Sequence, residues 1–281
     1  MVDLHTHSNC SDGSLTPTQL LRSAEEAGVT ALALCDHNTV AGLPEFMEAA
    51  KESTVKAVPA TELSVDYQGK ELHIVALFLP RESWGAVTER VNQLRRDKEE
   101  SNLALIASLR AGGYDITYEE VLAIAGGAWV NRAHVARVLT EKGYTASVKE
   151  AFAVLLKRGG PFYVPPKMPD AFETIAFIKD MGAVAVLAHP LLSLKADQLP
   201  EFLTQAKKAG LDGMETMYPL FDEKETAWLR QLAGEFGLLE SGGSDFHGAA
   251  KPDICIGIGR GNLLVDADFL EALEKRKSCR I

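Results

Sequence analysis

Cysteine is scarce in this chain and follows no pattern that would define a site or a scaffold. Four cysteines occur among 281 residues, and no two of them form a CxxC pair. Small disulfide-stabilised domains and thiolate zinc sites both need denser or more closely spaced cysteines. The start of the chain also lacks the basic segment and apolar run of a secretory signal. We therefore expect a protein of the reducing cytoplasm.

Long hydrophobic runs and basic clusters are also missing. No apolar stretch approaches the roughly 20 residues that span a bilayer. The formal net charge is −10, and a basic cluster on a predicted helix consists of just Arg95, Arg96 and Lys98. Proteins that hold long nucleic acids usually present a basic face. We expect no membrane partner and no stable nucleic-acid complex, although bound cations would still attract a small phosphorylated ligand.

The chain does contain a regular alternation of short apolar runs and amphipathic segments. The first amphipathic segment has Thr16 as a capping residue, Pro17 and Gln19 behind it, and Gly28 as a stop signal. Alternating strands and helices favour parallel strands with right-handed crossovers. An α/β barrel, distorted or open, is expected. Strands are predicted at residues 1–5, 31–35, 55–59, 73–78, 183–188, 213–217 and 238–241.

One region breaks this alternation. A long helical pattern over about residues 83–111 ends at Gly112 and Gly113, and three shorter helical patterns follow, each ending in glycine. No convincing strand lies among them. We interpret residues 91–160 as a helical insertion that covers the active site of a barrel formed by residues 1–90 and 161–281.

Histidines and carboxylates gather at the ends of the predicted strands. His5 and His7 are two apart at the end of the first strand, so that both imidazoles can point to one face. Ligands of parallel α/β folds bind at the carboxyl ends of the strands. His73 opens its apolar run, which indicates a strand that runs the other way or begins later. Imidazole with carboxylate suits Mn²⁺, Fe²⁺ or Zn²⁺, and we predict a multinuclear metal site. The other histidines at apolar runs are His37, His189 and His247.

The motifs that carry these residues resemble those of the polymerase and histidinol phosphatase (PHP) family. They are, in order, DLHTHSNCSDG, LCDHN, ATELS, the segment around His73, LAHP and GGSDFH. The resemblance runs from Met1 to about Gly248. It implies a distorted (β/α)7 barrel, three divalent ions (Mn²⁺, Fe²⁺ or Zn²⁺) and hydrolysis of phosphoesters. The segment NRAHVARVL further resembles a subgroup that hydrolyses nucleoside 3′,5′-bisphosphates and trims short RNA from the 5′ end.

The resemblance also implies which residues hold the ions. One ion is assigned to His5, His7 and Asp245, with Glu62 as a bridge. A second is assigned to Glu62, His73 and His134. A third is assigned to Asp12, His37 and His247. Two-metal and three-metal sites of this kind polarise phosphoryl oxygens and stabilise the leaving oxygen.

Three further residues are expected to contact the substrate. Asn131 is a good N-cap, which would place Arg132 and His134 in a first helical turn that favours phosphate. The Arg132 guanidinium suits a phosphate clamp, although an isolated helical histidine is more often structural. By the resemblance, His189 contacts the phosphate or protonates the leaving group; a metal ligand or a hydrogen bond to a carboxylate is the alternative. Ser8 is expected to donate to phosphate or to shape its loop.

Other polar residues near these motifs have two interpretations each. Asp3 would either orient an imidazole or be an exposed carboxylate. Asp36 would either orient His37 or cap the helix that follows. Glu215 and Tyr218 would either line the mouth of the site or pack in the core.

The leading functional hypothesis is a phosphatase or 5′ exonuclease that acts on a nucleotide or a short oligonucleotide. A second phosphate would need its own partners, for which Lys167 and Lys251 are weak candidates. A histidinol-phosphate-type or other small-metabolite phosphatase is the first alternative. A metal-binding module without activity is the second, and the complete set of ligands argues against it.

Overall fold

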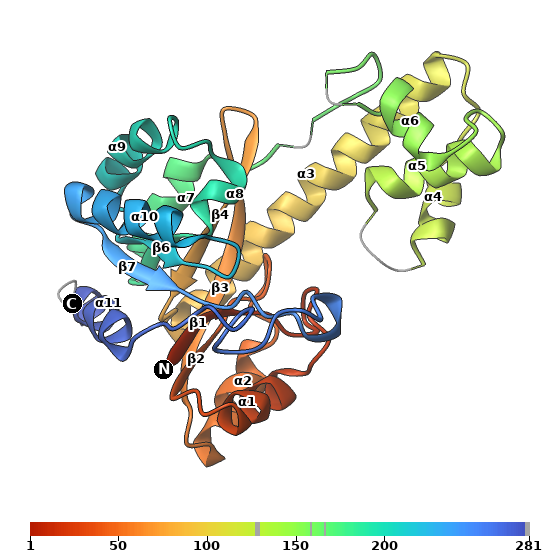
Figure 1. Ribbon diagram of the computed structural model, residues 1–281. Coiled ribbons are helices and arrows are strands. Elements are labelled where there is room, and N and C mark those ends of the chain that lie inside the picture. Colours follow the sequence, from red (N-terminus) through yellow and green to blue (C-terminus); the bar gives the residue numbers. More distant parts are fainter. Residues whose placement is uncertain (127–129, 158, 166, 279–281) are drawn as a thin grey trace. The chain divides into compact units, whose positions relative to one another are not determined.

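The computed structural model describes residues 1–126, 130–157, 159–165 and 167–278 (Figure 1). The chain divides into two compact units. Met1–Glu89 and Pro169–Ile281 form the first, which we name the barrel unit. Arg90–Met168 form the second, which we name the helical unit. Its end at Met168 lies beyond the predicted boundary at residue 160.

The barrel unit is built on one seven-stranded sheet whose strands follow the order of the sequence. All seven predicted strands are present. They are β1 (Val2–Thr6), β2 (Ala31–Leu34), β3 (Lys56–Tyr67), β4 (Lys70–Leu77), β5 (Val184–Leu187), β6 (Gly213–Met217) and β7 (Leu239–Gly242).

The sheet nearly closes on itself between its first and last strands. Just after β7, the Asp245 amide donates to the His5 carbonyl at 2.8 Å, and the His7 amide donates to the Phe246 carbonyl at 2.9 Å. The expected distorted (β/α)7 barrel is therefore confirmed.

Strand β4 is the one strand of this sheet that runs against both of its neighbours. It follows β3 through a hairpin at Gln68 and Gly69, whose φ values of 53° and 78° suit the tight turn between twisted strands. The first half of β4 consequently lies at the rim where the parallel strands end. His73 is in this half, opposite Ser64 of β3, which explains why it opens its apolar run.

Helices surround the sheet (Figure 1). The first has the expected capping box, in which Thr16 accepts from the Gln19 amide. Alternate strand residues share a face of the sheet, and one buried cluster collects such residues from neighbouring strands, among them Ala31, Ala33, Val58, Ala60, Val184 and Val186. The helices of the barrel unit are α1 (Pro17–Glu26), α2 (Leu43–Ala49), α7 (Ala171–Asp180), α8 (Pro190–Ser193), α9 (Leu199–Ala209), α10 (Glu223–Phe236) and α11 (Ala267–Ser278).

The helical unit has a hydrophobic core of its own. Helix α3 (Trp84–Ala111) leads into it, and α4 (Tyr118–Ala125), α5 (Arg132–Glu141) and α6 (Val148–Val154) complete it. Thr117 and Asn131 cap α4 and α5 through capping boxes. The helices of this unit and the segments between them contribute to one buried cluster, which includes Leu105, Leu109, Ile116, Val121, Val135, Leu139 and Leu156.

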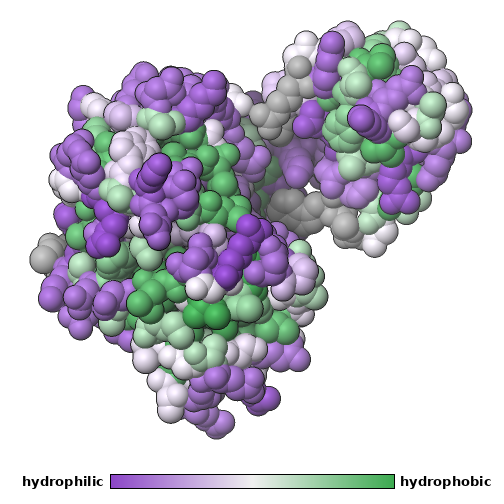
Figure 2. All heavy atoms as spheres, in the orientation of Figure 1, coloured by the Kyte–Doolittle hydropathy of each residue, from purple (hydrophilic) through white to green (hydrophobic). Residues whose placement is uncertain are grey.

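The visible face of the barrel unit carries both hydrophilic and hydrophobic residues (Figure 2). Among the described residues, no helix combines the length and the apolar character needed to cross a bilayer.

Asp3 links the two ends of the chain within the barrel unit. Its buried carboxylate accepts from the Ser244 amide at 2.8 Å, the Ser244 hydroxyl at 2.6 Å and the Gly257 amide at 2.8 Å. Both interpretations from the sequence are therefore wrong, because backbone and hydroxyl donors occupy this carboxylate and water does not reach it. Burial raises the pKa of Asp3, against the effect of these hydrogen bonds.

We expect Asp3→Ala to lower the free energy of unfolding by at least about 2 kcal/mol, because it leaves several buried donors without an acceptor. Urea denaturation followed by circular dichroism measures this change. Asp180→Ala, at the exposed end of α7, is the control and should stay within about 0.5 kcal/mol of the parent. Equal stability of both variants would contradict the role of Asp3.

Candidate metal centre

His5 and His7 lie at the end of β1 with both rings fully buried. Their ring centroids are 5.1 Å apart. The Nδ1 of His5 contacts Glu215 Oε1 at 2.7 Å. Its Nε2, and both ring nitrogens of His7, have no hydrogen-bond partner among the described residues. The strand thus directs two imidazoles with free nitrogens into one buried space.

The carboxylate of Glu62, on β3, lies at the centre of the histidines. Its Oε2 lies 3.2 Å from His5 Nε2, 3.4 Å from His7 Nε2 and 3.0 Å from His37 Nδ1. The side chain is fully buried. Burial would raise the pKa of Glu62, but the surrounding imidazoles, His5 first, hold it well below its usual range. Glu62 is therefore an ionised carboxylate in the interior.

The second oxygen of Glu62 meets two further imidazoles. Its Oε1 lies 2.8 Å from His73 Nδ1 on β4 and 2.9 Å from the Nε2 of His189, just after β5. His189 therefore makes the carboxylate contact that was one of its alternatives in the sequence.

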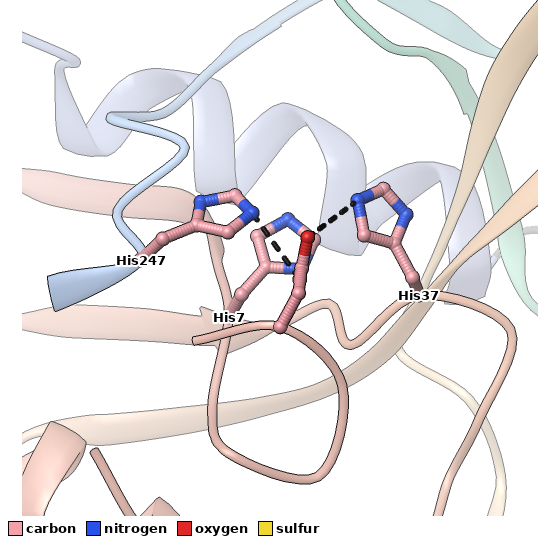
Figure 3. A group of neighbouring side chains, drawn as sticks. His7, His37 and His247 are labelled. Carbon is pink, nitrogen blue, oxygen red and sulfur yellow. Dashed lines mark ion pairs between the residues drawn. The ribbon is translucent and has the colours of Figure 1, made fainter. Parts of the chain in front are cut away.

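Asp12 lies beside three imidazoles from separate segments. Its Oδ1 is 3.3 Å from His247 Nε2 and 3.8 Å from His7 Nδ1, and its Oδ2 is 3.8 Å from His37 Nε2. Figure 3 shows the rings of His7, His37 and His247 converging from three parts of the chain. The carboxylate is half exposed, so that this part of the site opens to solvent.

Asp245 presents its two oxygens to different partners. Oδ1 lies 3.2 Å from His7 Nε2. Oδ2 accepts from the Tyr218 hydroxyl at 2.8 Å and pairs with the Lys251 ammonium at 2.6 Å. Tyr218 therefore orients a carboxylate of the site, which the sequence alone did not indicate. Lys251, a weak candidate for a phosphate contact, is half exposed beside it.

Among the described residues, four groups of side chains have potential ligand atoms within 4.8 Å of one another. All of them belong to the barrel unit and share members. The groups are His7, Asp12, His37 and His247; His5, His7 and Asp245; His5, Glu62 and His189; and His37, Glu62 and His73.

The structure thus brings together eight of the nine ligands that the resemblance implies, and adds His189. His134 lies in the helical unit, where its Nδ1 accepts from the Asn131 amide at 3.2 Å and completes the capping box of α5. Among the described residues, His134 belongs to none of the four groups.

The residues present fit divalent metal ions. Five buried polar atoms lack a hydrogen-bond partner among the described residues, and such atoms cost about 1–3 kcal/mol each. They border the shared interior of the four groups. Imidazole and carboxylate together suit Mn²⁺, Fe²⁺ or Zn²⁺. The atoms are His5 Nε2, His7 Nδ1, His7 Nε2, Glu62 Oε2 and His189 Nδ1.

The imidazoles of the site differ in how they hold protons. Burial lowers the pKa of His7 to about 3, so that its ring is neutral and ready to act as a ligand. Burial acts in the same direction on His73, but the Glu62 carboxylate outweighs it and raises the pKa of His73 to about 10. His73 therefore carries a proton that an incoming cation has to displace.

The loop that carries Asp12 is shaped by Asp36. The Ser8 amide and hydroxyl donate to its two oxygens at 2.7 Å and 2.6 Å, and the Ser11 hydroxyl donates at 2.6 Å. Ser8 is fully buried. The structure thus places the Ser8 hydroxyl on a carboxylate and supports its role in loop geometry. Asp36 organises this loop, which neither interpretation from the sequence proposed.

Arg132 begins α5, as predicted, and its guanidinium packs within the helical unit. It donates to the Leu156 carbonyl at 2.9 Å and lies 4.9 Å from the Tyr163 ring and 5.7 Å from the Phe152 ring. Lys167 is exposed in the same unit.

The barrel and its buried cluster define a protein with a multinuclear metal site at the ends of its strands. Residues 3–162 match the PHP domain, and the chain belongs to this family. Together with its similarity to hydrolases, this family membership identifies the chain as a PHP phosphoesterase.

Similar proteins cover nearly the whole chain. A 5′-3′ exoribonuclease of Haemophilus influenzae is 34% identical over 246 residues, which are 87% of this chain and 89% of that protein. A 3′,5′-nucleoside bisphosphate phosphatase of Chromobacterium violaceum is 29% identical over 88% of this chain and 87% of its own length. A phosphoribosyl 1,2-cyclic phosphate 1,2-diphosphodiesterase of Eggerthella lenta is 30% identical over 88% and 94%.

Solved structures are similar over the same extent. An amidohydrolase from Chromobacterium violaceum, with bound sulfate and no metal, has a TM-score of 0.70 and 26% identity, covering 99% of this chain and 96% of that one. A protein from Bifidobacterium adolescentis that has been assigned as a metal-dependent phosphoesterase has a TM-score of 0.68 and 28% identity, covering 99% of this chain and 95% of that one.

We expect Glu62→Gln to retain fewer manganese ions than the parent protein, by at least one per chain, because both oxygens face groups of ligands. Metal analysis after Mn²⁺ loading and gel filtration measures the content. Glu26→Gln, at the exposed end of α1, is the matched control. Unchanged manganese content in Glu62→Gln would show that this carboxylate holds no ion.

Mn²⁺ binding at pH 7 should release protons, because the raised pKa of His73 keeps its ring protonated until a cation arrives. The affinity should therefore rise from pH 6 to pH 8.5. Titration calorimetry in two buffers of different ionisation heat counts the protons, and His73→Gln should release fewer. Binding without proton release at pH 7 would contradict this state of His73.

Proposed function

We propose that this phosphoesterase hydrolyses nucleotide phosphomonoesters, converting nucleoside 3′,5′-bisphosphates to 5′-monophosphates, and that it also acts on the 5′ ends of short RNA. The buried cluster around Glu62 carries this proposal, because its unpaired imidazole and carboxylate atoms converge on one interior space. The names of the exoribonuclease and bisphosphate phosphatase relatives support the nucleotide class.

We assign three divalent ions to the four groups, because neighbouring groups share His5, His7, His37 or Glu62. Mn²⁺, Fe²⁺ or Zn²⁺ would be held by the members of these groups other than His189, with Glu62 shared between the ions. Bound ions of this kind polarise phosphoryl oxygens, activate water and stabilise the leaving oxygen. Against their six positive charges stand the carboxylates of Asp12, Glu62 and Asp245. The site would attract phosphate even though the whole chain is acidic.

His189 is proposed to serve the leaving oxygen of the substrate. Its ring is nearly buried, with Nε2 on Glu62 and Nδ1 without a partner among the described residues. Because Nε2 donates to the Glu62 carboxylate, Nδ1 carries a proton only in the imidazolium form of the ring. That proton can be passed to a departing alkoxide, a role worth ~10²–10⁴ in rate. The Glu62 contact would keep the ring in place while the proton moves.

The distribution of charge favours substrates with several phosphates. Residues 90–168 contain twelve Lys and Arg and eight Asp and Glu, a net charge of +4. Since the whole chain carries −10, the barrel unit carries −14. A cationic unit suits the phosphates of a nucleotide chain, whereas histidinol phosphate brings a cationic amine. Three expectations from the sequence stay predictions: that Arg132 binds phosphate, that His134 is a metal ligand, and that the helical unit covers the active site.

Phosphate release with Mn²⁺ tests the proposal. The substrates are adenosine 3′,5′-bisphosphate, AMP, histidinol phosphate, phosphoribosyl 1,2-cyclic phosphate and a 5′-phosphorylated dinucleotide. We expect the bisphosphate and the dinucleotide to give the highest kcat/KM, a chelator to abolish turnover, and His37→Ala to reduce kcat at least 100-fold.

The other outcomes separate the alternatives. A higher kcat/KM for histidinol phosphate or the cyclic phosphate would replace the nucleotide assignment with a small-metabolite one. Failure of all five substrates with Mn²⁺, Fe²⁺ and Zn²⁺ would leave a metal-binding module. Lys224→Ala, at the exposed start of α10, is the control for general effects of substitution and should retain full activity.

A further inference from the structure

Glu215 is a buried carboxylate that contacts two members of the site without joining any of the four ligand groups. It lies on β6 and is 1% exposed. Its Oε1 lies 2.7 Å from His5 Nδ1, and its Oε2 accepts from the backbone amide of His189 at 2.6 Å. Each oxygen therefore has one short contact, and the two contacts lead to different strands.

The first contact determines which nitrogen of His5 is available. An ionised carboxylate only accepts hydrogen bonds, so Glu215 requires the proton of the neutral ring to be on Nδ1. The lone pair is then on Nε2, which is buried, unpaired among the described residues, and 3.2 Å from Glu62 Oε2. This is the nitrogen that faces the proposed ions.

The second contact holds an unusual stretch of backbone. His189 has φ 27° and ψ 58°, a conformation that costs about 1–3 kcal/mol for a residue other than glycine unless its surroundings enforce it. Pro190 follows directly and begins α8. The hydrogen bond from the His189 amide to Glu215 fixes this turn, and the turn directs the ring to Glu62.

We propose that Glu215 is a positioning residue that sets two groups at once: the tautomer of His5 for metal binding and the placement of His189 for the substrate. The His189 part rests on the proposed function, whereas the His5 part does not. One carboxylate thereby links the group that holds an ion to the group that serves the leaving oxygen.

Glutamine cannot replace Glu215 in both contacts. If the amide oxygen accepts from the His189 amide, the NH₂ group faces His5 and moves its proton to Nε2, where it blocks metal binding. If the amide oxygen accepts from His5, the NH₂ group opposes the His189 amide, and two donors meet. Glu215→Gln therefore loses one function or the other at nearly unchanged volume.

The experiment measures metal affinity and leaving-group dependence separately. Glu215→Gln should bind Mn²⁺ about 10–100-fold more weakly, the usual effect of removing the carboxylate behind a ligating histidine. If His189 is displaced instead, kcat for adenosine 3′,5′-bisphosphate should fall at least tenfold more than kcat for p-nitrophenyl phosphate, whose leaving group needs no proton. Parent-like values in both measurements would overturn the proposal.

Glu240→Gln is the matched control. Glu240 lies on the neighbouring strand β7 and contacts Thr216 and Arg230, so that its substitution also removes a charge from a strand end. It should leave both the Mn²⁺ affinity and the leaving-group dependence unchanged. If Glu240→Gln weakens Mn²⁺ binding or changes the leaving-group dependence as much as Glu215→Gln does, the proposal is overturned. The effect would then come from removing any negative charge at a strand end.

A measurement on the unaltered protein avoids dependence on the folding of a variant. Long-range ¹H–¹⁵N spectra of the Zn²⁺-loaded protein, with the ring assigned through the His5 backbone, should show His5 protonated at Nδ1. Protonation at Nε2 would overturn the proposal. The His5 tautomer and the Mn²⁺ affinity are both measured without substrate. If both have the expected values and no phosphate ester is hydrolysed, the proposed function is wrong and the role of Glu215 at His5 stands.

Discussion

The buried carboxylate of Glu62 is the group on which the rest of the site depends. Five imidazoles from four segments of the chain lie within 3.4 Å of its two oxygens. An ionised carboxylate is costly in the interior unless opposite charges and hydrogen bonds compensate it. The histidines provide this compensation in the protein alone, and divalent ions would provide more. The barrel thus brings partners to one anion from the ends of β1, β2 and β5 and from the first half of β4.

The reversed strand β4 makes this arrangement possible on one side. In a regular parallel barrel, the residues at the start of a strand lie far from the functional rim. Because β4 runs the other way, His73 reaches the rim from the beginning of its strand and meets the second oxygen of Glu62. Without the reversal, that oxygen would have only His189 as a partner.

Most of the fold was predictable because the apolar runs are short, periodic and separated by clear helix signals. The pattern failed where chemistry interrupts it. Strand β3 extends to Tyr67, well past the predicted end at residue 59. The prediction ended too early because polar residues interrupt the apolar run that marks a strand, namely Thr61, Glu62, Ser64 and Asp66. The polar residues that include Glu62 therefore made this strand look shorter in the sequence than it is in the structure.

The candidate site was predictable where histidines mark strand ends, and not where its supporting carboxylates find partners far along the chain. Glu215 contacts His5 across 210 residues, and Asp3 contacts Ser244 across 241. Local spacing carries no signal for either pair. Asp36 lies 28 residues from Ser8, and nothing in its neighbourhood distinguishes a loop anchor from a helix cap. The assignment of His134 came from resemblance and stays a prediction.

The pairing of β1 with the segment after β7 has a consequence for biosynthesis. One edge of β1 finds its partners only in residues 245–265, at the opposite end of the polypeptide. At ribosomal speeds of about 5–20 residues per second, the nascent chain spends tens of seconds or less with that edge open. An unpaired strand edge is a template for wrong partners. The edge of β1 is therefore open to wrong pairing until residues 245–265 have been synthesised.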